Sequence, residues 1–436
     1  MRAMKDSGIE WIGKIPENWG ISPLRSKFSF GKGLSITKAD LCEEGVPVIS
    51  YGQIHSKDNS GVSAHESLIR HLPKDHENLS PTSLALKGDF IFADTSEDLQ
   101  GCGNCVYIDK EYPIYAGYHT LIVHPKDEQT GKFYAYLFTC DAWRAQVRAN
   151  VSGVKLYSIT QDILRRTYLL DPPTDEQAKI VQYLDKKCTD IDLLIKAKEK
   201  SNALLKERRQ SIIYEAVTKG LDPTVPMKDS GVEWIGEIPE KWELRKIKHN
   251  FDVFAGATPK SGETSFWDGD IPWITPADYT TEDMFVSAGK KSITQEGMDS
   301  CATNMIPEGS IVFSKRAPVG LVAITSNRLC TNQGCLSCVP RENIDTKYFY
   351  YTMSVFSNQF DLFASGTTFK EISSDSFANF KLPYPAYEIQ REIAAYLDYK
   401  CSEFDSAVAL NNSTIQKLKE YRQSLIYEAV TGKIEV

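Results

Sequence analysis

A segment with the spacing of a long helix occurs twice in the chain. Residues 177–218 read QAKIVQYLDKKCTDIDLLIKAKEKSNALLKERRQSIIYEAVT, and residues 390–431 read QREIAAYLDYKCSEFDSAVALNNSTIQKLKEYRQSLIYEAVT, aligned without a gap. In both copies the residues that would face a neighbour recur at alternating spacings of three and four, a pattern typical of a helix that packs along another helix. Each copy therefore predicts one long helix, roughly 60 Å in length.

The residues at these spacings define a seam along each predicted helix, with polar interruptions near its middle. A helix of this length is poorly buried by itself, and its own copy is the obvious partner. Cys188 and Cys401 occupy equivalent seam positions, where core packing is the better interpretation. The apolar residues predicted to line the seam are Leu184, Ile191, Ile195, Leu205 and Ile212 in the first helix and Leu397, Phe404, Val408, Leu418 and Leu425 in the second.

A second repeat opens each half of the chain. Residues 4–19 read MKDSGIEWIGKIPENW, and residues 227–242 read MKDSGVEWIGEIPEKW. The stretches between these openings and the helices barely match, although Ser152–Gly153 aligns with Ser365–Gly366. Two constant frames therefore hold two different inserts. The predicted domains are residues 1–172 and 221–385, and the predicted helical segments are residues 173–220 and 386–436.

The inserts are rich in strand signals. Residues 45–51 and 270–276 read as strand entries, and residues 88–92 and 309–313 are glycine-led runs of aromatic and β-branched residues. Short helices are predicted near residues 133–148 and 346–360. The predicted fold class is α/β in the α+β sense, with two mixed α/β domains joined by two long helices.

Connectivity predicts how the helices pair. Only Lys219–Pro226 separate the first helix from the second opening repeat, so the second body must start near the end of that helix. Antiparallel pairing keeps this body at one end, whereas parallel pairing would stretch it along the helices. We therefore predict an antiparallel coiled coil, two bodies related by a pseudo-two-fold axis, and chain ends that lie close together. The prolines within 171–175 and 382–386 end each body before its helix.

Composition narrows the class of protein. The 436 residues are 42% hydrophobic, which is typical of a soluble globular chain, and they carry a net charge of −8. No apolar run is long enough to span a membrane, and the polar Met1–Asp6 is unlike a signal peptide, so we expect a cytoplasmic protein with no membrane partner. The acidity argues against a nucleic-acid binder unless basic residues are concentrated locally.

Cysteine usage gives no clear metal site. Ten cysteines are spread over the chain without an evident disulfide framework. Cys102 with Cys105, and Cys335 with Cys338, have CxxC spacing, for which zinc is the alternative to ordinary free thiols. Because no further Cys or His completes four ligands at the usual spacings, we expect no metal.

Together these parts resemble the specificity subunit of type I restriction–modification enzymes. Both halves carry, in the same order, the opening repeat, the Ser–Gly pair, the proline turn and the closing Arg–Gln–Ser–X–Ile–Tyr–Glu–Ala–Val–Thr. The resemblance covers nearly the whole chain. It implies that the inserts are target-recognition domains, each reading one half of a bipartite, asymmetric site in double-stranded DNA. It also implies that the helical pair sets the gap between the half-sites.

The resemblance implies partners as well. Two methyltransferase subunits would dock on the helices, and two restriction subunits, which translocate DNA, would join the assembly. S-adenosylmethionine would be held by the methyltransferase partner, and ATP and Mg²⁺ by the restriction partner. This chain would be non-catalytic, without a cofactor of its own, in a bacterial or archaeal cytoplasm. Asp171–Pro–Pro–Thr174 resembles an adenine methyltransferase motif, but its fourth residue is not aromatic, and a turn is the favoured interpretation.

Candidate DNA contacts lie at strand ends and near the Ser–Gly pairs, because polar side chains there suit base edges and phosphates. Ser314–Lys315–Arg316 in one body matches Ala93–Asp94–Thr95 in the other. An arginine in one body and an acid in the other would fit different base preferences, and a surface ion pair is the competing interpretation of Arg316. A glycine-dependent turn is the alternative for the Ser–Gly loops. The candidates are Lys32, Lys38, Ser50, Tyr51, Gln53, Thr95, Lys155, Tyr157, Ser158, Thr258, Lys260, Thr275, Asp278, Lys315, Arg316, Thr367, Thr368 and Lys370.

Two alternative functions remain open from the sequence. The acidity favours an interaction scaffold that binds proteins and has no DNA role. A methyltransferase would need a glycine-rich cofactor loop after a strand, which we do not find. The repeated Trp11, Trp19, Trp234 and Trp242 are predicted to anchor the constant frame or a surface that binds a partner, since a base reader should differ between the bodies.

Overall fold

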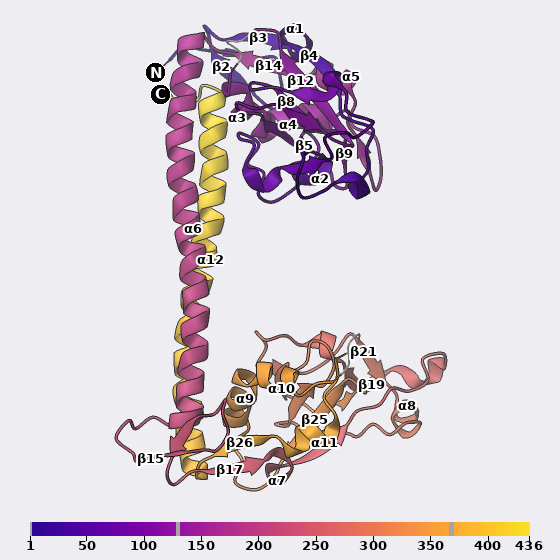
Figure 1. The fold of residues 1–436 in the computed structure, drawn as a ribbon, viewed down its shortest axis with the longest axis vertical. Helices are drawn as coiled ribbons and strands as arrows, with labels where there is room; N and C mark the ends of the chain where they lie inside the picture. Colours follow the sequence, from indigo (N-terminus) through magenta and orange to yellow (C-terminus); the bar gives the residue numbers. More distant parts are fainter. Residues whose placement is uncertain (1, 128–130, 366–369) are drawn as a thin grey trace. The chain divides into compact units, whose positions relative to one another are not determined.

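The computed structural model describes residues 2–127, 131–365 and 370–436 (Figure 1). Its contacts divide the chain into two compact units: unit 1 is Met1–Lys198 with Ser413–Val436, and unit 2 is Glu199–Asn412. Each unit contains one insert and a part of both long helices. In the parts of the chain that are described, no helix is long and apolar enough to cross a membrane.

Unit 1 holds the first insert, built from two four-stranded sheets with orders β10-β8-β12-β4 and β6-β5-β11-β7. Its strands are β1 (Met4–Asp6), β2 (Lys14–Pro16), β3 (Gly20–Pro23), β4 (Phe28–Lys32), β5 (Val46–Ile49), β6 (Arg70–Leu72), β7 (Leu84–Ala85), β8 (Phe90–Ala93), β9 (Thr95–Ser96), β10 (Cys105–Tyr107), β11 (Ile114–Ala116), β12 (Thr120–Pro125), β13 (Tyr157–Ser158) and β14 (Tyr168–Asp171). Its short helices are α1 (Leu24–Lys27), α2 (Tyr51–Ile54), α3 (Phe133–Thr139), α4 (Asp141–Arg148), α5 (Gln161–Arg166), η1 (Lys38–Asp40), η2 (Glu66–Leu68) and η3 (Pro81–Ser83).

The central strand β8 divides unit 1 into two cores. Phe90 and Phe92 pack with α3 and α4, and the Phe90 ring lies 4.9 Å from the Phe138 ring. The intervening Ile91 packs with the second sheet instead. Because successive side chains of a strand point to opposite faces, a continuous apolar run produces a strand that is buried on both sides.

Unit 2 repeats this arrangement with a five-stranded sheet, order β18-β25-β22-β23-β20, and a three-stranded sheet, order β21-β19-β24. Its strands are β15 (Met227–Asp229), β16 (Glu237–Pro239), β17 (Glu243–Lys246), β18 (Phe251–Ala255), β19 (Trp267–Ile274), β20 (Phe285–Val286), β21 (Lys291–Ile293), β22 (Ile311–Ser314), β23 (Val322–Thr325), β24 (Cys330–Thr331), β25 (Cys335–Pro340) and β26 (Lys381–Tyr384). Its short helices are α7 (Ile247–Asn250), α8 (Gln295–Asp299), α9 (Thr346–Val355), α10 (Ser357–Leu362), α11 (Ser374–Asn379), η4 (Thr264–Phe266) and η5 (Pro276–Asp278).

The predicted correspondence between the inserts is therefore structural as well. Strands β18, β25 and β22 occupy the places of β4, β12 and β8. The register agrees too, since Phe28 pairs with Pro125 and Phe251 with Pro340. The predicted strands and short helices of both bodies are confirmed, with each predicted helical stretch divided into two helices.

Two long helices, α6 (Thr174–Lys219) and α12 (Tyr387–Val430), follow the bodies, as predicted. Within unit 2 they are antiparallel, since Asn202 contacts Asn412 while Arg209 contacts Asp405. In unit 1 the first half of α6 packs on the last half of α12 (Figure 1). The second helix ends before residue 436, because Gly432 adopts a φ of +68° that terminates it.

The predicted seam residues differ in how deeply they are buried. The buried seam residues are Leu184, Ile191, Ile195, Leu397 and Leu425, and the half-buried ones are Leu205, Ile212, Phe404, Val408 and Leu418. In unit 2 a layer of amides interrupts the seam, where Asn411 donates to Asn202 at 2.8 Å. A cavity of about 490 Å³ lies beside Leu205, Phe404 and Val408. The predicted packing of Cys188 and Cys401 is confirmed, as both are buried.

In each unit, a lysine and a tyrosine one helical turn apart fasten the body to a long helix. In unit 1, Tyr136 donates to Asp185 at 2.6 Å and Lys132 lies 2.7 Å from the same carboxylate. In unit 2, Tyr351 donates to Asp398 at 2.9 Å, and Lys347 is 2.5 Å from that carboxylate. Asp185 and Asp398 are equivalent positions of the helix repeat. The same polar contact therefore orients each body on its own helix segment.

The opening repeats cap the helix ends. In unit 1, Trp19 is buried beside Gly432, so the two chain ends lie close together, as predicted (Figure 1). Trp242 is buried beside Gly220 in unit 2, and Trp234 stacks on Phe380 with ring centroids 5.7 Å apart. These three tryptophans anchor the frame, as predicted. Trp11 is 45% exposed, so for this residue the alternative of a surface that binds a partner stays a prediction.

Candidate nucleic-acid interface

Four chain segments meet at one edge of the first body. We call residues 50–55, 94–95, 117–119 and 157–159 the unit 1 edge. Backbone hydrogen bonds hold it: Gly117 donates to Ile49 (2.7 Å), Asp94 donates to His119 (3.1 Å), and Ile159 donates to Asp94 (2.7 Å). The strands β5, β8 and β11 end here, so the residues that follow them are brought together.

Aromatic and polar side chains fill the unit 1 edge. The Tyr51 ring lies 5.9 Å from His55, 5.7 Å from Tyr118 and 5.7 Å from His119, measured between centroids. Thr95 donates from its hydroxyl to Asp94 at 2.7 Å. β13 pairs with β9, which sets Ser158 opposite Thr95 and Tyr157 opposite Ser96. The structure thus gathers four of the predicted candidates, Tyr51, Thr95, Tyr157 and Ser158.

Two candidates at this edge serve the fold instead. Ser50 is fully buried, because Gly117 packs so closely on it that a Cβ there would lie 2.0 Å from the Ser50 Oγ. The Gln53 side chain turns back and accepts from the Ser50 amide at 3.1 Å, which caps α2. In this conformation the Ser50 hydroxyl does not reach the surface.

The second body has an equivalent edge, residues 275–278, 315–316, 332–334 and 371–372, which we call the unit 2 edge. Its backbone bonds repeat those of unit 1: Asn332 donates to Ile274 (2.9 Å), Lys315 donates to Gly334 (2.9 Å), and Ile372 donates to Lys315 (3.0 Å). The two edges therefore share one backbone frame but differ in side chains.

Charge distinguishes the unit 2 edge. Glu371 lies 2.9 Å from both Lys315 and Arg316. Hydrogen bonds, first from Lys315 and then from Arg316, lower the pKa of the Glu371 carboxyl, so it stays ionised. The ion pair that competed with a DNA role for Arg316 is thus present, although 47% of the Arg316 side chain remains exposed. At the corresponding place, unit 1 has Asp94 and Thr95.

Thr275 and Asp278 are engaged in a capping box. The Asp278 carboxylate accepts from the Thr275 amide and hydroxyl, each at 2.8 Å, and from the Lys290 amide at 3.0 Å. These bonds use most of the carboxylate's acceptor capacity, so Asp278 has little left for a base. Thr258 lies next to this edge, since its hydroxyl contacts Gln333.

The remaining candidates are scattered. Lys32 is exposed beside the unit 1 edge, where the next residue, Gly33, donates to Thr120 at 3.0 Å. Lys38 is exposed in η1, and Lys155 is exposed on the loop between Ser152 and Ser158. Lys260 is exposed, and Lys370 pairs with Asp361 at 2.7 Å. Thr367 and Thr368 lie outside the described residues.

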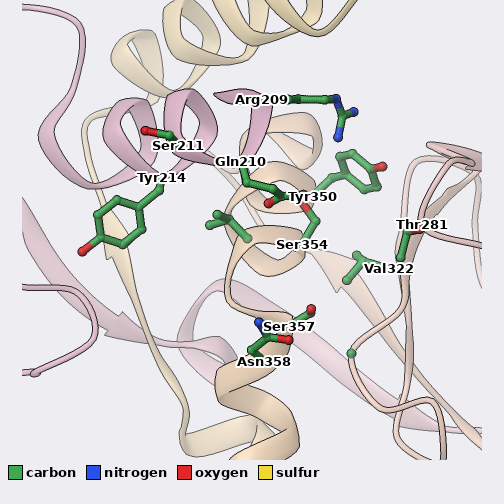
Figure 2. A pocket seen from close by; sticks show the side chains of 12 residues that line it. Arg209, Gln210, Ser211, Tyr214, Thr281, Val322, Tyr350, Ser354, Ser357 and Asn358 are labelled. Atoms are coloured by element: carbon green, nitrogen blue, oxygen red, sulfur yellow. The ribbon is translucent and has the colours of Figure 1, made fainter. Parts of the chain in front are cut away.

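A polar cavity of about 550 Å³ lies in unit 2, lined by residues of α6 and α9 (Figure 2). Arg209, Gln210 and Ser211 enter it from α6, and Tyr350 and Ser354 enter it from α9. The Nε of Arg209 is buried, with no hydrogen-bond partner among the described residues. None of the DNA candidates lines this cavity, which makes it a separate surface beside the helices.

The thiols and the proline turn have structural explanations. Cys105 and Cys335 are fully buried, and burial raises the pKa of each thiol to about 12, as for neutral thiols that pack in a core. Within the described ranges, no group of three or more His, Cys, Asp or Glu side chains could hold a metal. Asp171 pairs with Lys27 at 2.8 Å and accepts from Tyr134, and Thr174 opens α6. That motif is a turn here, as favoured from the sequence.

Sequence reasoning missed four residues of the edges: Tyr118, His119, Gln333 and Glu371. The first three lie in matched segments, since IYAGYHTLIVHP (114–125) and LCTNQGCLSCVP (329–340) align without a gap. That alignment contained the signal, because the two strands correspond while the turn residues before them differ.

The fold is thus a duplicated scaffold that carries two different exposed edges. Residues 16–203 and 239–420 both match the family model described as the type I restriction modification DNA specificity domain. The chain therefore belongs to the family of type I restriction–modification specificity subunits, and its role is in DNA sequence specificity.

Individual relatives agree with this assignment. The MjaIX specificity subunit of Methanocaldococcus jannaschii is 37% identical over 38% of this chain and 39% of its own length. The putative MjaX specificity subunit of the same organism is 22% identical, covering 98% of this chain and 96% of that protein. A specificity subunit of Escherichia coli, EcoR124I/EcoR124II, is 29% identical over 47% of this chain and 50% of its own length.

Solved structures share the fold. One from a study of the complex assembly and conformational transition of the type I R-M system has a TM-score of 0.73 at 18% identity, covering 96% of this chain and 99% of that chain. The HsdS subunit from Thermoanaerobacter tengcongensis has a TM-score of 0.54 at 18% identity, with 96% and 98% covered.

Proposed function

We propose that this chain selects the DNA site of a type I restriction–modification complex, with unit 1 reading one half of a bipartite, asymmetric sequence and unit 2 reading the other. The observation that carries the proposal is the pair of edges. Their backbone hydrogen bonds correspond one by one, while their side chains differ in charge and in hydrogen-bonding type. Recognition of two unlike half-sites requires different base-contacting side chains, and a shared backbone frame can hold both sets.

The unit 2 edge suits a guanine-containing half-site. Arg316 can present two donors to the O6 and N7 of guanine, which is the commonest specific protein–DNA contact. Glu371 holds Arg316 in place and would have to share it with the base. The unit 1 edge offers Tyr51, His119 and Ser158 instead, and these suit a different set of base edges.

The chain's acidity is consistent with this role if partners supply much of the phosphate contact. We propose that two methyltransferase subunits dock along α6 and α12 and that two restriction subunits join through them. In this assembly the target-recognition domains are residues 1–172 and 221–385, and the helical segments 173–220 and 386–436 set the gap. Catalysis lies outside the chain: S-adenosylmethionine belongs to the methyltransferase partner, and ATP with Mg²⁺ belongs to the restriction partner.

The direct test uses the chain copurified with its methyltransferase partner. The complex is incubated with a library of random duplexes and S-adenosylmethionine, and methylated adenines are mapped by sequencing. The expected result is one bipartite, asymmetric motif with a fixed gap, and no methylation by the chain alone. A stable complex that methylates or protects DNA without sequence preference would overturn the proposal in favour of an interaction scaffold.

A further inference from the structure

A histidine occupies a disfavoured backbone conformation at the unit 1 edge. His119 has a φ of +54°, in the left-handed region where a Cβ is disfavoured. The turn that carries it is tightly held: Tyr51 donates to the Tyr118 carbonyl at 3.2 Å, Asp94 donates to the His119 carbonyl at 3.1 Å, and the Thr120 hydroxyl donates to the Gly117 carbonyl at 2.7 Å. A glycine would adopt this turn more readily, so the turn alone does not explain the side chain.

The second body forms the corresponding backbone hydrogen bond without this side chain. In the matched segment, Gly334 stands at the place of His119, and its carbonyl accepts from Lys315 at 2.9 Å, although the φ of Gly334 lies outside the left-handed region. The frame therefore forms without an imidazole. The imidazole of unit 1 is an addition to the edge and is not needed to build it.

The surroundings of His119 leave one ring nitrogen available. Its side chain is 60% exposed, and Nδ1 lies 3.4 Å from the Asp94 carboxylate. A carboxylate beside Nδ1 favours the tautomer with its proton there, which leaves Nε2 as an acceptor. Across the described residues no hydrogen bond occupies that Nε2. The rings of Tyr51 and Tyr118 flank the imidazole, with centroids 5.7 and 6.1 Å away.

The neighbouring His55 provides the contrast. Its Nε2 lies 2.9 Å from the Thr95 carbonyl, and its Nδ1 lies 3.1 Å from the Asn104 amide nitrogen. Both nitrogens of His55 are therefore used inside the body. His119 has the opposite arrangement, with one nitrogen facing a fixed carboxylate and the other facing solvent.

We propose that His119 is a specificity-determining residue of the first half-site, accepting through Nε2 a hydrogen bond from the exocyclic amino group of an adenine or a cytosine in the major groove. Both bases present that donor there, and guanine and thymine present acceptors instead. Asp94 is a positioning residue that sets the tautomer. The proposal rests on the proposed function of the chain.

The test replaces His119 with glycine, which the backbone accepts, in the chain copurified with its methyltransferase partner. His119→Gly is expected to keep the melting temperature or raise it. It should reduce discrimination at one position of one half-site by about 5- to 10-fold, leaving the other half-site unchanged. Asp94→Asn should weaken discrimination at the same position.

Base analogues separate the two sources of the amino group. A duplex with purine in place of adenine, or with 2-pyrimidinone in place of cytosine, lacks the donor. The wild-type complex should bind one of these analogue duplexes about 5- to 10-fold more weakly than the unmodified duplex. The His119→Gly complex should bind the analogue and the unmodified duplex with the same affinity.

His124 supplies a matched control, because it pairs with Asp89 at 2.9 Å at the opposite end of the same strand, β12. His124→Gln should leave the motif unchanged. If the His119→Gly complex discriminates between bases as strongly as the wild-type complex at every position of the motif, the inference is overturned and the proposed function stays intact. If the wild-type complex itself shows no sequence preference, the proposed function fails and the inference fails with it.

Discussion

Arg422 donates a hydrogen bond to Asp192 across the two long helices of unit 1, at 2.6 Å. The repeat places Arg209 at the position of Arg422 and Asp405 at the position of Asp192, so unit 2 contains the same pair in reciprocal order. There the closest approach, from Arg209 Nε to Asp405, is 3.7 Å, which is too long for a hydrogen bond. One repeated contact is thus formed in unit 1 and open in unit 2, beside the cavity of Figure 2.

The first prediction concerns the strength of these two pairs. A double-mutant cycle of Asp192→Asn with Arg422→Gln should give a coupling energy of about 0.5–1 kcal/mol, because both side chains are partly exposed and solvent screens them. The cycle of Asp405→Asn with Arg209→Gln should give a coupling near zero. Urea denaturation of the full chain measures both cycles. Equal couplings in the two units would contradict the difference in geometry.

The second prediction concerns alkaline pH. Burial, followed by the contact with Asp185, raises the pKa of Tyr136, and burial likewise raises the pKa of Tyr351 beside Asp398. Above about pH 10 the unfolded chain loses phenolic protons that the folded chain retains, so the free energy of unfolding should fall as pH rises. Urea denaturation at pH 8 and at pH 11 should show this fall.

The matched variants identify the tyrosines responsible. Tyr136→Phe and Tyr351→Phe should each make the alkaline loss smaller, while lowering stability at pH 8 by about 1 kcal/mol through the missing hydrogen bond. The exposed Tyr168→Phe serves as the control and should change neither quantity. An identical pH dependence in all variants would show that other groups control it.

The parts of the fold that the sequence predicted are those fixed by repetition and by local pattern. The seam spacing and the short connection after Lys219 were enough to predict antiparallel helices. The Ser–X–X–Gln of Ser50–Gln53 and the Thr–X–X–Asp of Thr275–Asp278 are patterns typical of helix caps, and this is how the structure uses them. Residues first considered as base readers thus carried a local signal for a structural role.

Other features depend on contacts between distant residues. Arg316 meets Glu371, which is 55 positions away, and no local pattern indicates that pairing. The strained turn at His119 depends on strand ends that meet only in the folded body. The seam residues differ in burial because different side chains pack beside them. The heptad spacing alone does not contain this difference, so it predicted the same burial for every seam residue.

The third prediction tests the Arg316 ion pair. Arg316→Ala should relax one position of the second half-site, at a cost of about 1–3 kcal/mol in binding, and leave the first half-site unchanged. Glu371→Gln should release Lys315 and Arg316 toward phosphates, so nonspecific affinity and its salt dependence should both increase. Binding to specific and random duplexes at several salt concentrations measures both effects.

Arg341 is the matched control for Arg316. Its side chain is also about half exposed and is paired with a carboxylate, that of Asp252 at 2.6 Å. Arg341 follows the last residue of β25, whereas residues 332–334 of the unit 2 edge precede the first residue of that strand. Arg341→Ala should leave the motif as it is. Loss of specificity in Arg341→Ala equal to that in Arg316→Ala would place the reading surface elsewhere.

The fourth prediction tests whether the bodies read independently. Exchanging residues 28–167 for the insert of another family member should change only the half-site read by unit 1. The exchange keeps Lys27 and Asp171, whose ion pair at 2.8 Å closes the first body. Mapping methylated adenines in the complex with the partner gives the new motif. A change in both half-sites would mean that the bodies do not read separately.

The fifth prediction tests whether the helices set the gap. Seven residues are inserted after Lys198 and seven at the equivalent place after Asn411, because a heptad preserves the 3/4 spacing of the seam. Each helix lengthens by about 10.5 Å, and base pairs are stacked about 3.4 Å apart, so the preferred gap should grow by about three base pairs or activity should be lost. Inserting seven residues in α6 alone would misalign the seam and is expected to destabilise both units. Normal methylation with an unchanged gap in the doubly lengthened chain would refute the role of the helices as a ruler, because another part of the assembly would then have to set the distance between the half-sites.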